Sequence, residues 1–223
     1  MRNLTIYVQE GLKVNSKSKF GKKYQPLTRK ELKNLVGQFI EERGVDVDLN
    51  DIDTSKIEAM DELFIDSDFN GDISKWNVSN VVSMRDMFKN SKFNGDISNW
   101  NVSKVVDMSG MFCGSNFNQD ISNWNVGKVE TMDNMFRLTD FNRNISKWDV
   151  HNVVSMSGMF AYSEFNQDIS NWDVSNVEWL NYMFYDSEFN QDISNWKIKK
   201  SASKKYAFED CPLENNLPSW YRK

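Results

Sequence analysis

A column of aspartates is the feature of this sequence that could bind metal ions. It comprises Asp72, Asp96, Asp120, Asp168 and Asp192, and Asn144 interrupts it. Stacked carboxylates bind calcium in some repeat proteins, but calcium takes about six to eight oxygen ligands and this column supplies one carboxylate per repeat. We therefore interpret each aspartate as the acceptor of an Asx-turn, bonded to a nearby backbone N–H. A parallel asparagine column is expected to do the same: Asn70, Asn94, Asn118, Asn142, Asn166 and Asn190.

The single histidine is the other candidate for chemistry. His151 stands close to Asp149, Asp173 and Lys147. One imidazole makes neither a zinc site nor a catalytic triad unless partners lie in position, so an exposed histidine outside any active site is favoured. The sequence also lacks a glycine-rich phosphate loop, a C-x-x-C pair and a nucleophile elbow. We predict no enzyme and no cofactor, and keep His151, Asp149 and Asp173 as candidates for contact with a partner.

A repeat of 24 residues positions these side chains. Its tryptophan recurs at Trp76, Trp100, Trp124, Trp148, Trp172 and Trp196. A fixed period in this range predicts a solenoid that behaves as one elongated domain. Apolar residues at the same steps extend the array from Val45 to Trp220. We predict an N-terminal cap over residues 1–44, a solenoid over 45–200 and a degenerate C-terminal capping repeat over 201–223.

Each repeat has two apolar patterns. Ile73, Trp76 and Val78 form an L-x-x-L-x-L arrangement, which is typical of the short strand of a leucine-rich repeat. The residues that follow have helical spacing and predict a short helix or irregular turn: Val81, Met84, Met87 and Phe88. Because the Trp and Met columns recur in every repeat, we interpret them as core rather than as cofactor sites.

The N-terminal cap should contain one amphipathic helix. Thr28 and Glu31 form a capping box at its start, and Gly44 is expected to end it in a left-handed conformation. Before it, Leu4–Val8 and Leu12–Val14 are predicted as short strands. The cap is basic, with nine cations up to position 33: Arg2, Lys13, Lys17, Lys19, Lys22, Lys23, Arg29, Lys30 and Lys33. Such a stretch could grip nucleic acid or an acidic partner, but without interleaved aromatic residues a solvated face is favoured.

Large apolar residues break the repeat near its C-terminal end. They replace small or polar residues of the same column in other repeats: Trp179, Tyr182, Tyr185, Tyr162 and Leu138. A repeat architecture does not require these choices, and Trp and Tyr dominate binding hot spots. The sequence therefore predicts an exposed partner-binding patch, with packing against the segment Tyr206–Tyr221 as the open alternative.

Composition narrows the class of protein. The chain has 223 residues, of which 39% are hydrophobic and 13% aromatic, and its formal net charge is -5. This content favours an ordered protein and disfavours a general DNA binder. No segment approaches the roughly 18 apolar residues that span a bilayer, and no secretory signal is recognised. Cys113 and Cys211 lie four repeats apart, about 20 Å at about 4.8 Å per repeat, so no disulfide between them is expected.

The pattern I-x-x-W-x-V…V-x-x-M-x-x-M-F-x-x-S resembles the BspA-like class of leucine-rich repeats, in the variant with F-N-x-D-I-S-x-W motifs found in mycoplasma-type lipoproteins. The resemblance covers about Val45 to Trp220. It implies a right-handed solenoid used for adhesion or protein recognition. Together with the missing export signal, it predicts a non-enzymatic, cytoplasmic binding scaffold of a bacterium or phage, one version being an inhibitor that covers a host or defence protein. The alternative is a surface adhesin or virion component.

Overall fold

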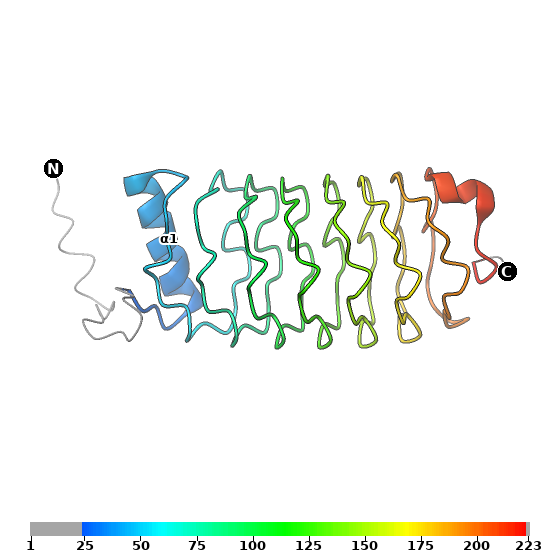
Figure 1. The fold of residues 1–223 in the computed structure, drawn as a ribbon, viewed down its shortest axis with the longest axis horizontal. Helices are drawn as coiled ribbons and strands as arrows, with labels where there is room; N and C mark the ends of the chain where they lie inside the picture. Colours follow the sequence, from blue (N-terminus) through cyan, green and yellow to red (C-terminus); the bar gives the residue numbers. More distant parts are fainter. Residues whose placement is uncertain (1–23, 222–223) are drawn as a thin grey trace.

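The chain forms an elongated stack of 24-residue coils. A computed structural model describes residues 24–221, with helix α1 (Arg29–Arg43) at one end of the stack and the 3-10 helix η1 (Pro212–Asn216) at the other (Figure 1). Isolated parallel bridges join each coil to the next in one column, from Ala59–Ser83 to Trp179–Ser203. The strands expected at Leu4–Val8 and Leu12–Val14, and most of the basic stretch, lie outside the described residues.

The strand and helix expected in each coil do not form in residues 24–221. The segment from Ile73 to Val78 is a series of tight turns, in which the Trp76 N–H donates to the Ile73 carbonyl at 3.1 Å. Asp72 Oδ1 accepts from the Ser74 N–H at 2.8 Å, which bends the chain where an extended strand was predicted. Apolar spacing placed these side chains inward correctly, but local side-chain-to-backbone bonds decide the backbone path.

A row of backbone hydrogen bonds runs through the second half of each coil, where a short helix was expected. We call this segment the polar strip, and in the second coil it covers residues 84–90. In the second coil, N–H groups at every other residue donate to carbonyls of the next coil: Met84 to Asp107, Asp86 to Ser109, Phe88 to Met111 and Asn90 to Cys113, at 2.7–2.9 Å. This path needs positive φ at two residues, 52° at Asp86 and 53° at Asn90. Because these N–H groups cross between coils, they are not available for an i→i−4 helix.

Aromatic columns fill the core. Phe88 stacks on Phe112 with ring centres 5.6 Å apart, and the tryptophan and methionine columns are buried. Each indole also crosses to the previous coil, as Trp124 Nε1 does when it donates to the Ile97 carbonyl at 3.2 Å. The prediction that the Trp and Met columns are core is confirmed.

Helix α1 covers the first coil. Its apolar side chains join the same core: Leu32, Leu35, Val36 and Phe39. Thr28 Oγ accepts from the Glu31 N–H at 3.2 Å, and Glu31 accepts in turn from the Leu27 N–H at 2.7 Å. Gly44 ends the helix as expected, but with φ 91° and ψ 170° rather than in the left-handed helical region. Its N–H still reaches the Ile40 carbonyl at 2.9 Å, so only the exit direction differs.

The C-terminal segment continues the core for one more coil. Trp220 Nε1 donates to the Ile193 carbonyl at 2.8 Å, which repeats the tryptophan bond of earlier coils. Cys211 is buried in this segment and Cys113 in the third coil of the series, both as free thiols. Within residues 24–221, no helix has the length and apolar character to cross a membrane.

Candidate functional site

The aspartate column forms turns, which confirms the structural interpretation. Asp168 Oδ1 accepts from the Ser170 N–H, and Asp192 Oδ1 from the Ser194 N–H, both at 2.9 Å. Asn144 makes the same turn with Ser146, so the turn needs an acceptor oxygen rather than a charge. The backbone and hydroxyl bonds from these serines lower the pKa of Asp168 and of Asp192. In the part of the chain that the structure describes, no group of three or more candidate ligands could hold a metal ion.

The asparagine column differs from its expected role. Asn70 Oδ1 accepts from the N–H of Asn94 at 2.8 Å, and Asn94 Oδ1 from Asn118 at 2.9 Å. These bonds join neighbouring coils instead of closing a turn within one coil. A side-chain oxygen thus replaces a backbone carbonyl in the ladder between coils.

His151 lies on an exposed corner of its coil. Its Nδ1 is 2.7 Å from Asp149 Oδ1, and the Asn176 side chain donates to its carbonyl at 2.8 Å. Asp173, in the next coil, has its pKa lowered by bonds from Ser175, with a smaller contribution from His151. Among residues 24–221, no hydrogen bond, ion pair or ring contact joins this corner to the C-terminal tyrosines.

Four tyrosines on the polar strip form one contiguous surface, the tyrosine cluster: Tyr162, Tyr182, Tyr185 and Tyr206. Ring centres are 5.3 Å apart for Tyr162–Tyr185, 5.7 Å for Tyr185–Tyr182 and 5.1 Å for Tyr182–Tyr206. A cation flanks each end, with Arg137 4.6 Å above the Tyr162 ring and Lys205 4.5 Å from the Tyr206 ring. Such contacts restrain exposed rings.

Bulky residues of this surface occupy backbone positions that disfavour them. The φ angles are 57° at Leu138 and Tyr162 and 59° at Tyr182 and Tyr206. Other coils place Gly110, Gly158 or Asn134 in the Tyr182 column. Left-handed conformations cost a residue with a Cβ roughly 1–2 kcal/mol, and outliers of this kind concentrate at functional sites. The backbone conformation at these positions therefore does not explain why bulky side chains occur there.

The structure gathers some of the predicted residues and separates others. Tyr162, Tyr182 and Tyr185 meet, and Leu138, 53% exposed, occupies the Tyr162 column one coil earlier. Trp179 is 46% exposed, but within the described range it makes no ring contact with the cluster. Tyr206 was not among the predicted residues, although it lies one period after Tyr182. The alternative of packing against the C-terminal segment holds in part: Tyr182 contacts Tyr206 and Tyr185 bonds the Asp210 side chain. Tyr182 nonetheless keeps 42% of its surface exposed.

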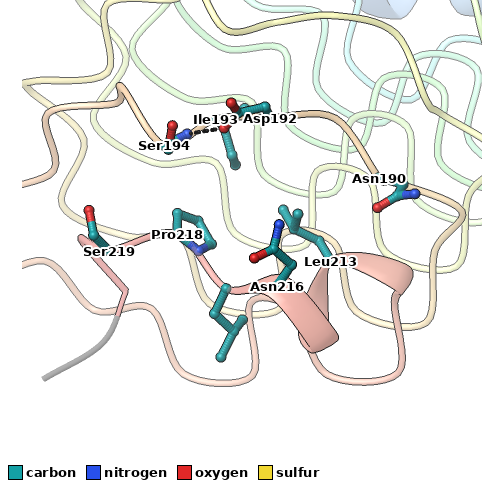
Figure 2. A pocket seen from close by; sticks show the side chains of 9 residues that line it. Asn190, Asp192, Ile193, Ser194, Leu213, Asn216, Pro218 and Ser219 are labelled. Atoms are coloured by element: carbon teal, nitrogen blue, oxygen red, sulfur yellow. Dashed lines mark hydrogen bonds between the residues drawn. The ribbon is translucent and has the colours of Figure 1, made fainter.

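A cavity of about 350 Å³ lies between the last regular coil and the C-terminal segment. Figure 2 shows Asn190, Asn216 and Pro218 around it. In earlier coils the asparagine equivalent to Asn190 accepts a hydrogen bond from the backbone of the next coil, but after Asn190 the chain turns away into η1. Asp192 is already bonded to Ser194. The cavity is thus a consequence of the repeat ending.

Stacked coils joined at a constant step, with one cluster that departs from the repeat, define a tandem-repeat protein with a localised surface. The chain belongs to the family described as "Mycoplasma protein of unknown function, DUF285", whose model matches residues 32–139 and again residues 114–220. No curated protein and no solved structure matches the chain.

Proposed function

We propose that this chain is a non-enzymatic scaffold that binds another protein through the tyrosine cluster. The proposal places its fold with the leucine-rich-repeat-like right-handed solenoids and its repeats with the BspA-like class. Stacked coils, parallel contacts between them and the family match support this placement.

The observation that carries the proposal is the set of exposed, bulky residues at positive φ. Tyr162, Tyr182 and Tyr206 accept an unfavourable backbone conformation and yet are 38–42% exposed. Glycine or asparagine would satisfy the fold at lower cost. Tyrosine contributes a large contact area with few rotatable bonds, and the ring contacts reduce the entropy lost on association.

In its narrower form, the proposal makes the chain a bacterium- or phage-encoded inhibitor that acts in the cytoplasm by covering a host or defence protein. A surface adhesin or virion component is the competing form. Fractionation of the producing cells, with detection in cytosol, envelope and particles, separates the two. Recovery only in envelope or particles contradicts the inhibitor.

The binding proposal is tested by affinity capture from the producing cells. The double variant Tyr182→Ser/Tyr185→Ser should lose a protein that the wild type retains stoichiometrically. Val82→Ala is the matched control, because Val82 is also an exposed apolar side chain, but lies in the second coil. Equal capture by the wild type and the double variant would reject the cluster as the contact surface, provided that both melt cooperatively.

A further inference from the structure

A trough crosses the polar strip at the coil that follows Asn90. It is an open cavity of about 520 Å³. Its floor contains Gly110 and Cys113, and Gly114 follows. The glycines leave room for the preceding coil: a Cβ on Gly110 would collide with Asp86 Oδ1, and one on Gly114 would lie 2.5 Å from Asn90 Oδ1. The two glycines therefore permit the close approach of Asp86 and Asn90 from the preceding coil.

Three cations line this trough: Arg85, Lys89 and Arg137. Arg85 lies 3.7 Å from Glu62 and Lys89 lies 3.5 Å from Asp86, both in exposed pairs. Arg137 differs from them. Its guanidinium is held over the Tyr162 ring, and within the described part of the chain no ion pair or side-chain hydrogen bond engages it. Arginine presents a planar fork of donors that matches a carboxylate.

The charges that line the trough act on the Cys113 thiol at its floor. Burial raises the pKa of the Cys113 thiol, Lys89 and Arg137 both act to lower it, and Asp86 acts to raise it. The two cations come from coils on opposite sides of Cys113. Cations thus flank the floor on both sides and outnumber the opposing Asp86 there, which favours an anionic group.

The trough continues into the tyrosine cluster through one residue. Arg137 lines the trough and also contacts Tyr162, whose ring touches Tyr185. Leu138 lies next to Arg137 in the chain and is exposed. The cation-lined trough and the apolar surface of Leu138 and the tyrosine cluster are therefore adjacent along the axis of the stack.

We propose that the trough binds a carboxylate side chain from an extended acidic segment of the partner protein, with the Arg137 guanidinium donating to that carboxylate. The adjoining apolar part of the segment lies on Leu138, Tyr162 and Tyr185. This inference rests on the proposed function, since it specifies the partner of the same face. Asp86 and Asp133 also line the trough, but Lys89 pairs with the first and Ser155 and Ser157 donate to the second. A nucleic-acid strand fits less well, because among the described lining cations Arg137 alone lacks an ion pair. Backbone phosphate recognition requires several cations along the strand.

The test is a selection from a displayed random-peptide library against the full chain, followed by anisotropy titration of the enriched peptides. Arg137→Gln and Lys89→Gln are the test variants. Arg143→Gln is the matched control: this arginine lies in the coil that follows that of Arg137, and its Nε donates to the Asn118 carbonyl at 2.9 Å, away from the trough. Labelled single-stranded oligo-dT serves as the nucleic-acid probe.

We expect acidic peptides with neighbouring apolar residues to be enriched. Arg137→Gln should weaken their binding roughly tenfold or more, since a charged hydrogen bond contributes about 1.5–3 kcal/mol. Arg143→Gln should leave it unchanged. Enrichment of non-acidic peptides, an unchanged affinity in Arg137→Gln, tighter binding of oligo-dT, or no enrichment would each overturn the inference. Peptides that keep their affinity for Arg137→Gln but lose it for Tyr182→Ser/Tyr185→Ser would reject the carboxylate site alone and leave the proposed function standing.

Discussion

Arg137 and Tyr162 belong to adjacent coils, and the guanidinium of the first lies 4.6 Å from the ring centre of the second. This pair joins the trough to the tyrosine cluster. The ring restrains an otherwise mobile side chain, and the cation covers one face of a tyrosine at positive φ. One contact therefore orders parts of both candidate surfaces.

Leu138→Asn should raise the free energy of unfolding by about 0.5–1 kcal/mol. Leu138 is exposed and has φ 57°, a conformation that asparagine tolerates better than leucine. Urea denaturation measures the effect. Val82→Asn is the control, since Val82 is exposed without a positive φ, and an equal gain in that variant would argue against relief of strain.

Trp124→Phe should destabilise the chain by about 2–3 kcal/mol, because it removes a buried donor and leaves a void. Trp124 is buried, and its indole N–H bonds the Ile97 carbonyl. Thermal or urea unfolding reports the change. Trp179→Phe, at an exposed site, should stay within about 0.5 kcal/mol of wild type. A similar loss in both variants would contradict the role assigned to the indole bond.

Stability should fall as the pH drops below about 4, the ordinary range of aspartate. The pKa of Asp120, Asp168, Asp173 and Asp192 lies below its ordinary value because these carboxylates accept bonds from serines. A lowered folded-state pKa means that the unfolded chain binds protons more readily, so the contribution is complete above the unfolded pKa and is lost as pH falls through the folded one.

Urea midpoints at a series of pH values measure this dependence. Asp168→Asn should flatten it and retain the fold, because Asn144 already makes the same turn without a charge. A variant with an unchanged acid slope would show that the column does not contribute to acid sensitivity.

Arg29→Met should loosen the first coil by about 1 kcal/mol or more. Arg29 Nε donates to the Asp61 carbonyl at 2.5 Å, at the edge that no preceding coil covers. Hydrogen exchange of residues in the first coil should accelerate, while later coils keep their protection. Arg29 also lies 3.4 Å from the Glu62 carboxylate. Arg85→Met removes the other cation beside Glu62 but no side-chain bond to the backbone, and it should leave the exchange rates unchanged.

The apolar columns were predictable because a constant step fixes which residues face inward. The same regularity made Asp168 recognisable as a turn residue. The backbone path was not predictable in the same way, since apolar spacing around Met84 and Met87 suits both a helix and a strip with alternating φ. The sequence signal for this path lies in one column, which contains Asp86, Gly110 and Asn134. Glycine, asparagine and aspartate together favour positive φ. Tyr206 was missed because a degenerate last coil hides its place in the Tyr182 column.

The polar strip also gives the molecule a direction. Its N–H groups point toward the C-terminal end, so within this strip the first coil presents carbonyls and the last coil presents N–H groups. A basic side chain closes the carbonyl edge, since Arg29 Nε donates to the Asp61 carbonyl at 2.5 Å. A carboxylate closes the other, since Glu214 accepts from the Asp210 N–H. Because each regular coil presents the same donors and acceptors to its neighbours, a whole coil can be added or removed without a change to either end.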